Sequence, residues 1–485
     1  MLKKILFLLL VSIGCNAQTF WTTPVITSLD RPVAFDFAPD GRIFITQKGI
    51  NTPISITAQV KVYDSNYNYL GIFYYVSDST DSDFERGLIG IAIDPDFTNN
   101  HYIYCYYVHL YNGDERLRIV RLTEINNVGI NPAIIFDYDV AENIPGTHVG
   151  GNLHFRPSEP DKIYFTIGDL GSNQTDTALN YARKLTTPFG KTLRINKDGT
   201  IPTDNPFYDD GNILTGNCDL IWSYGHRNAF DFCFSPVNDS FYVSENGLSA
   251  WDEVNMIHAG KNYGWNECEG NFKNSSTTVP CDDTSAIPPI TTWGNPLGGV
   301  TGILFYTGSV IPGLDNHLLV ANSDDGAIFD IALGNAPFYD TVLSNTFLTD
   351  PTTVAGLTTI KQGADGCIYA LNGGYLINAS LYRICPSWMN VEVNKNAPFI
   401  LQQNFPNPFN SSTAIHYFLK EKSALQIILL DANGKQITTL KEGVSYPGEY
   451  ELTIDALALN LAAGNYYCVM QADGESQSIL ISIVK

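Results

Sequence analysis

The sequence predicts an all-β protein, in which a six-bladed β-propeller is followed by a small C-terminal β-sandwich. The 40 Gly, 25 Pro and 27 Tyr among 485 residues favour short strands and many turns. A weak repeat indicates the propeller: an apolar strand, a turn rich in Pro, Asp, Gly and Asn, and an aromatic-rich strand recur. No helical period competes with these hairpins. The six copies begin at Phe35, Ile91, Leu153, Phe232, Ile303 and Leu357.

The repeats place the propeller at residues 19–388, a linker at 389–400 and the sandwich at 401–485. Residues 1–17 are expected to be a secretory signal peptide, because two lysines precede an apolar run at 5–13 that is too short to span a bilayer. Cleavage is expected after Ala17. The alternative is a lipoprotein in which Cys15 is acylated. No other segment approaches membrane-spanning length.

Charge and cysteine usage agree with export. The formal net charge of −22 argues against a nucleic-acid partner, and it fits a soluble secreted surface and, more weakly, cation binding. Cys268 with Cys281 and Cys367 with Cys385 are expected disulfides of an oxidising compartment. The spacing matches no zinc template. Cys218 and Cys233 could form a third disulfide. Cys105 and Cys468 are expected to be buried free thiols.

Residues 221–265 carry the strongest indication of a site. His226, Arg227 and Asn228 come directly before one predicted strand pair, and the acidic residues Glu245, Asp252 and Glu253 come after it. Loops at the ends of a hairpin carry function because the strands hold them in place. Opposite charges at the two ends therefore predict a binding site.

The order of motifs in this stretch, GHRN, E-x-G, DE-x-N and GKNYGW, resembles the glucose/sorbosone dehydrogenase family of soluble sugar dehydrogenases that use pyrroloquinoline quinone (PQQ). The resemblance spans roughly residues 30–385 and is densest between 146 and 265. It implies oxidation of an aldose at C1 to a lactone, with PQQ and Ca²⁺ as cofactors.

The resemblance implies a general base at His148, which lies among glycines before the third repeat. Histidine suits that role because its ordinary pKa is near 6.5. Thr147 stands where the family has Asp, so recognition of the sugar hydroxyls is expected to differ. Glu85 of ERGLIG corresponds to a residue that points toward substrate. The alternatives are an ordinary loop histidine and an exposed loop carboxylate.

The resemblance also implies the cofactor and metal ligands. Arg227 and Asn228 match the cofactor-binding pair, and an Arg fork suits the quinone carboxylates. The backbone carbonyls of Gly247 and Leu248 correspond to ligands of the calcium that also holds the quinone. A structural calcium is implied at Asp252, Glu253 and Tyr263. The alternative is that both acids cap loops or pair with Lys261 and Arg227. Four aromatic residues could stack on a ligand but are more often core: Trp222, Tyr224, Tyr263 and Trp265.

The last two repeats depart from the family. Relatives hold the cofactor carboxylates with a Lys on the fifth blade and Arg residues before the sixth. Here Asp324 and Asp325 lie near the position of that Lys, and the segment TTVAGLTTIKQGADG around the start of the last repeat contains no Arg. Because a buried tricarboxylate needs cationic partners, Arg194 and Lys361 are candidate substitutes.

The C-terminal segment contains PNPF at 406–409, a DANGK turn at 431–435, GNYY at 464–467 and a terminal Lys485. This pattern resembles the C-terminal sorting domain of the type IX secretion system. It implies the secretion machinery as a partner and passage through the periplasm to the cell surface or the medium. The alternative is a carbohydrate-binding or adhesive sandwich.

These observations predict a secreted, quinoprotein-like sugar dehydrogenase. The alternative is a non-catalytic propeller that has lost the cofactor and binds a glycan or a protein partner. Hydrolysis of a lactone or ester at a propeller calcium is a third class, but no nucleophile in the sequence supports it.

Overall fold

A computed structural model describes two compact units, which fall on either side of the boundary between Pro386 and Ser387. The predicted signal peptide and nearly all of the predicted linker lie outside the described residues. The described ranges are 20–50, 57–76, 80–111, 114–140, 147–171, 180–248, 251–274, 276–294, 299–311, 313–348, 354–386, 399–401, 403–404, 406–432 and 434–484.

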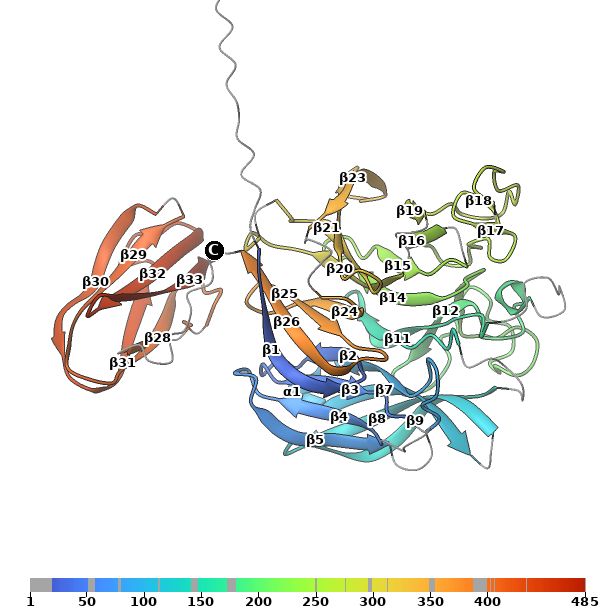
Figure 1. Ribbon diagram of the computed structural model, residues 1–485, viewed down its shortest axis with the longest axis horizontal. Helices are drawn as coiled ribbons and strands as arrows, with labels where there is room; N and C mark the ends of the chain where they lie inside the picture. Colours follow the sequence, from blue (N-terminus) through green and yellow to red (C-terminus); the bar gives the residue numbers. More distant parts are fainter. Residues whose placement is uncertain are drawn as a thin grey trace, which may run out of the picture. The chain divides into compact units, whose positions relative to one another are not determined.

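The first unit contains six four-stranded antiparallel sheets, which follow one another in chain order (Figure 1). The first is β2 (Pro32–Phe37), β3 (Ile43–Gln47), β4 (Ala58–Tyr63) and β5 (Tyr69–Val76). The second is β6 (Leu88–Ile93), β7 (Tyr102–Tyr111), β8 (Asp114–Ile125) and β9 (Val128–Val140), with the one-turn helix α1 (Phe97–Asn100) between β6 and β7. The third is β10 (Leu153–Arg156), β11 (Glu159–Ile167), β12 (Lys191–Asn196) and β13 (Ile221–Tyr224), with the 3₁₀ turn η2 (Tyr181–Arg183) before β12.

The remaining sheets complete the unit. The fourth is β14 (Ala229–Phe234), β15 (Phe241–Glu245), β16 (Trp251–Ile257) and β19 (Thr291–Gly294), and a small hairpin, β17 (Cys268–Glu269) and β18 (Phe272–Lys273), lies between its last two strands in sequence. The fifth is β20 (Val300–Tyr306), β21 (His317–Asn322), β22 (Ile328–Gly334) and β23 (Thr341–Phe347). The sixth is β24 (Leu357–Gln362), β25 (Ile368–Asn372), β26 (Ile377–Pro386) and the N-terminal strand β1 (Phe20–Asp30).

Every predicted hairpin is present as an antiparallel strand pair within one sheet. The first shows how local chemistry makes the turn. Gly41 has a φ of 85°, and Asp40 accepts a hydrogen bond from the Arg42 backbone N–H at 3.1 Å. Asp and Gly are the residues that such turns favour. The alternation of turn residues with β-branched and aromatic residues is therefore sufficient to form these pairs.

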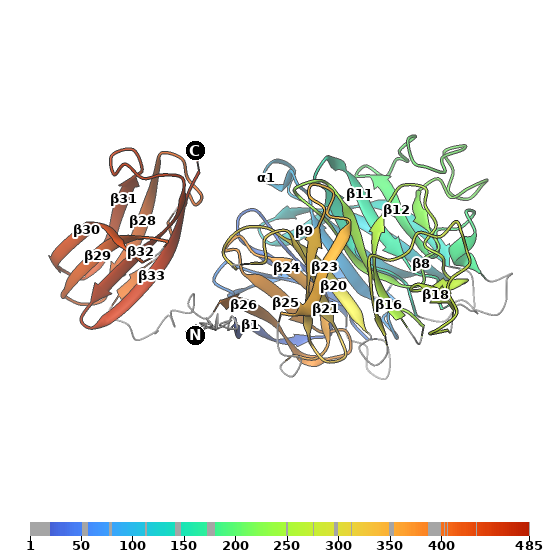
Figure 2. The same cartoon turned by 90° about the horizontal axis from the view of Figure 1, so that it is seen from above.

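The sheets pack face to face, and apolar side chains fill the layers between neighbours. Tyr106 and Phe165 lie in the layer between the second and third sheets, and Phe305 and Phe329 lie in the layer between the fourth and fifth. The first strands of the sheets, β2, β6, β10, β14, β20 and β24, contact one another in a closed sequence. These six strands therefore surround the middle of the unit. Figure 2 gives a second view, in which two of them, β20 and β24, are labelled.

The sixth sheet joins the two ends of the first unit. Strand β1 pairs with β26 from Phe20 opposite Pro386 to Asp30 opposite Ile377, and the blue and orange strands lie side by side in Figure 1. The N-terminal strand thus supplies the outer edge of a sheet whose other strands come from the end of the unit.

Two of the expected disulfides are present, Cys268–Cys281 and Cys367–Cys385. The third, between Cys218 and Cys233, was a wrong expectation, since both are free cysteines. Cys218 is buried between the second and third sheets, whereas Cys233 packs between the fourth and fifth. The layers that hold the two sulfurs are different, so proximity in sequence does not bring them together. Cys105 and Cys468 are buried free thiols, as expected.

The second unit is built from a three-stranded and a four-stranded antiparallel sheet that share one apolar core. The first sheet holds β27 (Phe399–Leu401), β28 (Ser412–Leu419) and β31 (Gly448–Asp455). The second holds β30 (Gln436–Ser445), β29 (Ser423–Asp431), β32 (Gly464–Ala472) and β33 (Glu475–Ile483). Within the described ranges, no helix has the length and apolar character needed to cross a membrane.

Candidate active site in the central cavity

A cavity of about 670 Å³ lies in the middle of the first unit, and all six sheets or the loops that follow their strands contribute to its wall. Five of the residues predicted from the sequence line it: Glu85, Asn228, Gly247, Leu248 and Asp252. The described lining lacks the other predicted residues: Thr147, His148, Arg227, Glu253 and Tyr263. Of these, His148 and Arg227 pack directly behind it, as their contacts below show.

His148 is held by two carboxylates. Its Nδ1 lies 2.6 Å from Oδ1 of the buried Asp169, and its backbone N–H donates to Oε2 of Glu85 at 2.6 Å. Among described residues, no hydrogen-bond partner is found for Nε2. The backbone of His148 has a φ of 55°, a left-handed conformation that costs a non-glycine residue about 1 kcal/mol. The loop therefore fixes the ring with one nitrogen oriented by an acid and the other available.

Asp169 is itself held in place by two further hydrogen bonds. Its second oxygen accepts a hydrogen bond from the Trp265 indole at 2.8 Å, and its first also accepts one from the Gly171 backbone at 2.9 Å. A carboxylate oxygen that faces one imidazole nitrogen accepts a hydrogen bond from it, so the proton of the neutral ring sits on Nδ1 and leaves Nε2 with a free lone pair. The arrangement therefore presents Nε2 of His148 as a proton acceptor.

Glu245 holds the GHRN loop in place. Its carboxylate, 2% exposed, lies 2.8 Å from Nδ1 of His226 and accepts hydrogen bonds from the Arg227 backbone N–H at 2.5 Å and the Asn255 amide at 3.2 Å. The His226 ring is fully buried and stacks on Tyr263. His226 and Glu245 thus position their neighbours.

Arg227 reaches from this loop toward Asp169, the partner of His148. Its guanidinium lies over the Trp265 ring and donates to the Asn246 carbonyl at 3.0 Å, while its own backbone carbonyl accepts from Asp169 N–H at 2.7 Å. Its Nε is buried and has no hydrogen-bond partner among the described residues. Asn228, next in sequence, lines the cavity and donates to the Asn246 side chain at 3.2 Å.

The residues predicted to hold calcium have other contacts. The Asp252 carboxylate accepts backbone N–H groups of Gly247 at 2.8 Å, of Val300 at 3.0 Å and of Gly299. Burial raises its pKa. Burial and the neighbouring Glu245 and Glu269 raise the pKa of Glu253 well above its ordinary value.

The Tyr263 hydroxyl forms hydrogen bonds with the backbone of β16 and of the residue that follows it. It donates to the Met256 carbonyl and accepts from the His258 N–H, both at 2.8 Å. Gly247 is required by close packing, because a Cβ there would lie 2.0 Å from the Trp251 carbonyl oxygen. Of the residues predicted to hold calcium, Gly247, Leu248 and Asp252 line the cavity.

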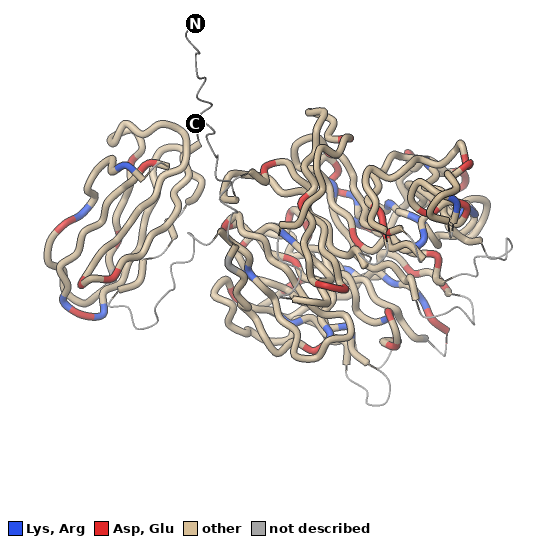
Figure 3. The backbone as a smooth tube through the Cα atoms, turned by 45° about the horizontal axis from the view of Figure 1, so that its top comes forward, with Lys and Arg blue, Asp and Glu red and all other residues tan. Residues whose placement is uncertain are grey.

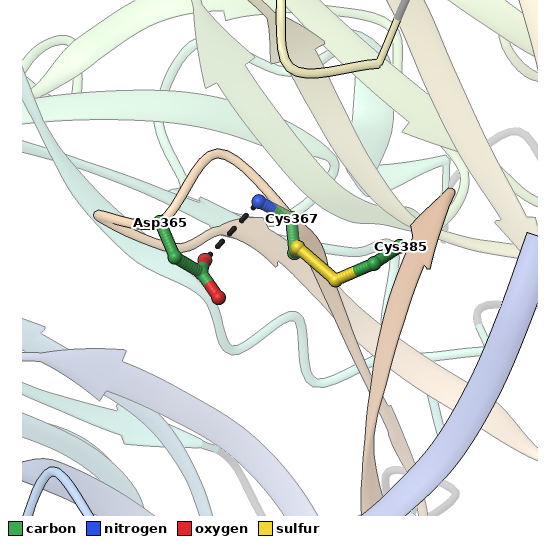
Figure 4. Close-up of side chains that lie close together, drawn as sticks. All are labelled: Asp365, Cys367 and Cys385. Carbon is green, nitrogen blue, oxygen red and sulfur yellow. Dashed lines mark hydrogen bonds between the residues drawn. A yellow bond between two sulfur atoms is a disulfide. The ribbon is translucent and has the colours of Figure 1, made fainter. Parts of the chain in front are cut away.

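Two groups in the described part of the chain bring three metal-ligand atoms within 4.8 Å of one another, and neither contains a predicted calcium ligand. One is Asp365 with Cys367 and Cys385, whose sulfurs are joined in the disulfide of Figure 4. The other is Asp209, Asp210 and Asp219. Asp219 is saturated by backbone N–H groups of its own loop. Both groups therefore hold loops together.

The charge of the cavity wall differs from expectation. Neither candidate substitute reaches the cavity: Arg194 is buried against Glu159 and Asp204, and Lys361 pairs with Asp36 at 2.8 Å. Acidic and basic positions are interspersed over the unit as a whole (Figure 3). At the described cavity wall, however, the single cation is Lys48, against the carboxylates of Glu85, Asp252 and Asp324.

Sequence reasoning did not identify Asp169, Asn246 or Lys48 as site residues. Asp169 ends the IYFTIGD strand, whose match to the family was a usable signal. Asn246 replaces a family histidine inside a recognised motif. Lys48 belongs to no recognised motif, so its position at the cavity wall follows only from the arrangement of the sheets.

Comparison with known proteins agrees with this geometry. Residues 29–378 match the family model described as Glucose / Sorbosone dehydrogenase, and residues 403–484 match that of a secretion system C-terminal sorting domain. An uncharacterised protein of Synechocystis is 28% identical over 75% of this chain and 87% of its own length. Quinoprotein glucose dehydrogenase B of Acinetobacter calcoaceticus is 29% identical over 54% of this chain and 55% of its own. The PQQ-bound aldose sugar dehydrogenase of Streptomyces coelicolor superposes with a TM-score of 0.58 at 22% identity, over 76% of this chain and 99% of that one.

Proposed function

The chain belongs to the glucose/sorbosone dehydrogenase family, and from this membership we propose that it is a secreted sugar dehydrogenase that oxidises an aldose at C1 to the lactone. The observation that carries the proposal is the contact of His148 Nδ1 with Asp169 at 2.6 Å, beside the cavity-lining Glu85. A histidine oriented in this way is a general base for a sugar hydroxyl.

The fold is proposed to be a six-bladed β-propeller with the six four-stranded sheets as blades, and the second unit a β-sandwich. In such a propeller the ligand enters where loops gather at the channel mouth. The cavity-lining loops around Glu85, Asn246 and Tyr375 would form that mouth.

The residues present fit the size and the polar groups of PQQ. The cavity volume is within the range of cofactor sites. The buried Arg227 Nε lacks a partner among the described residues, the Asn228 amide faces the cavity, and Lys48 adds a cation. Arg227, Asn228 and Lys48 would hold the quinone, which supplies a two-electron acceptor when it is bound.

The proton chemistry belongs to the chain itself. His148 Nε2 would accept the proton of the C1 hydroxyl, and Asp169 would stabilise the imidazolium that forms. The quinone held by Arg227, Asn228 and Lys48 would supply the acceptor for the two electrons that leave C1 when the lactone carbonyl forms. Glu85 would accept hydrogen bonds from other sugar hydroxyls. The Thr147 hydroxyl would accept or donate one, without the charge of the carboxylate that relatives have there.

Calcium is proposed at the carbonyl oxygens of Gly247 and Leu248, which suit a hard cation. A structural calcium involving Asp252, Glu253 and Tyr263 would have to compete with their hydrogen bonds inside the protein. The first site is therefore the stronger proposal.

A second candidate is a non-catalytic propeller that binds a glycan or a protein partner. The observation that favours it is the excess of carboxylates, Glu85, Asp252 and Asp324, at the described cavity wall. These charges oppose a tricarboxylate and leave a neutral polyol unaffected.

Export is proposed to start with cleavage of the signal peptide and to end at the cell surface or in the medium. The sorting domain at residues 403–484 would be recognised by the type IX machinery after the chain reaches the periplasm.

Calorimetric titration of PQQ into the purified protein with Ca²⁺, followed by a dye-linked screen of aldoses, tests the proposal. Micromolar binding and sugar-dependent dye reduction are expected. A folded protein that fails to bind PQQ at high concentration would reject the dehydrogenase and leave the second candidate.

A further inference from the structure

Lys48 follows β3 of the first sheet and lies at the cavity wall with a residue exposure of only 4%. Its ammonium donates to the carbonyl oxygens of Phe84 and, at 3.4 Å, of Ser82. The Tyr375 ring centroid lies 4.6 Å from the same nitrogen. Among the described residues it forms no ion pair, so carbonyl dipoles and a ring compensate this buried charge.

Lys191 shows what a purely structural buried lysine looks like in this protein. It is fully buried, outside the described cavity lining, and donates to three carbonyl oxygens, those of Tyr181, Ala182 and Phe189, at 2.6–2.9 Å. An ammonium has three N–H groups, so Lys191 is saturated. Lys48 has two carbonyl acceptors, one of them distant, and borders an open cavity. Its third N–H therefore lacks an acceptor among the described residues.

A buried cation is costly unless an opposite charge compensates it. Burial and the nearby Arg31 lower the pKa of Lys48 to about 8, although Glu85, Asp83 and Asp81 act in the opposite direction. At neutral pH the side chain is mostly charged, and an anion in the cavity would stabilise that form.

We propose that Lys48 is the cationic anchor for a cofactor carboxylate in this chain, so that the first sheet supplies the charge that the fifth and sixth sheets lack. The inference rests on the proposed function, since it takes the quinone as the occupant. Lys48 belongs to the first sheet and Asn228 precedes the fourth, so the two would hold a flat polyacid from opposite sides of the proposed ring. Tyr375, whose ring packs on the ammonium, would keep the side chain extended toward the cavity.

The test is calorimetric titration of PQQ into the full-length protein with Ca²⁺ at pH 7. Lys48→Met is expected to weaken binding roughly 10- to 100-fold, as loss of a charged hydrogen bond does. Lys48→Arg, which keeps the charge, is expected to retain most of the affinity. The matched control is Lys361→Met, which removes a lysine of the same unit that pairs with Asp36 outside the described cavity lining.

A pH series on the wild type gives a second readout that needs no variant to fold. Affinity is expected to fall by about tenfold or more between pH 7 and 9.5 as Lys48 loses its proton. The groups facing it are Arg31, the acids at 81, 83 and 85, and Tyr375. Guanidinium and carboxyl groups ordinarily titrate outside this pH range. Burial raises the pKa of Tyr375 above its ordinary value of 10.

The outcomes separate the two proposals. Wild-type binding that is equal in Lys48→Met, or that is flat with pH, would overturn the role of Lys48 and leave the dehydrogenase standing. Absence of PQQ binding to the folded wild type would overturn the dehydrogenase and the anchor with it.

Discussion

The two halves of the unit around the cavity are built by different means. At the third and fourth sheets, candidate site side chains in or behind the cavity wall bond to one another: His148 to Asp169, His226 to Glu245, and Asn228 to Asn246. In the fifth and sixth sheets, hydroxyl groups bond to backbone carbonyls instead, Thr301 to Leu357 at 2.8 Å and Thr359 to Val33 at 2.9 Å. One half therefore orients charges and a proton acceptor, while the other seals the seams between neighbouring sheets.

This difference explains how the family residues can be absent from one half without loss of the fold. A seam that depends on hydroxyls, glycines and carbonyls tolerates an exchange of Lys for Asp at its edge. A network of buried acids and histidines does not tolerate the loss of one member, because each remaining partner would stay buried and unpaired.

Removal of the proposed base should have the largest effect. His148→Ala is expected to lower kcat by about 10²- to 10⁴-fold in the dye-linked assay, because general-base catalysis is worth that much. PQQ affinity should change little. The control is His317→Ala, which removes a histidine paired with Asp330 in the fifth sheet. Unchanged turnover in His148→Ala would reject the assignment of the base.

Glu245→Ala should cause the next largest effect, on stability. Three buried donors, from His226, Arg227 and Asn255, would lose their acceptor, so a loss of about 3 kcal/mol in unfolding free energy is expected. Chemical denaturation measures it, with the exposed Glu451→Ala as control. A loss of unfolding free energy below about 1 kcal/mol would contradict the view that the buried acid–histidine network is more sensitive to substitution than the hydroxyl-sealed half.

Thr359→Val tests the other half. It deletes one buried hydroxyl that bonds the Val33 carbonyl across the seam between the sixth and first sheets. A loss of about 1 kcal/mol is expected, with turnover unaffected. Loss of activity at constant stability would mean that this half takes part in the chemistry.

Asp324→Asn should give the smallest change, in the opposite direction. Asp324 lines the cavity, and an amide of the same shape removes its repulsion of an anion, so PQQ affinity is expected to rise about threefold. Asp325→Asn is the matched control. The Asp325 carboxylate is next in sequence, accepts a hydrogen bond from the Ala327 N–H and is absent from the described cavity lining. Equal effects at both positions would show that the repulsion is not local to the wall.

Local sequence was sufficient for the hairpins, because turn residues and strand alternation act over a few positions. Motifs also predicted a site at His148, Arg227 and Asn228, and the structure places Asn228 at the cavity wall. The IYFTIGD match at residues 163–169 was a usable signal for Asp169. The position of Lys48 depends on contacts between sheets, which no local pattern contains. Arg194 and Lys361 were wrongly expected to hold the cofactor carboxylates. Each forms an ion pair elsewhere, Arg194 with Glu159 and Lys361 with Asp36, and such contacts between distant segments are not visible in the local sequence.

The pairing of β1 with β26 also sets the order in which the molecule can assemble. Phe20 and Pro386 are 366 positions apart, and closing so long a loop in a flexible chain costs about 5 kcal/mol of entropy. That cost falls only when the intervening sheets have already shortened the path, so this strand pair should be the last to form and the first to open. When it opens, β26 becomes a bare edge with unsatisfied backbone groups, the kind of edge that recruits strands from other chains. The N-terminal strand thus protects the protein against aggregation as much as it completes a sheet.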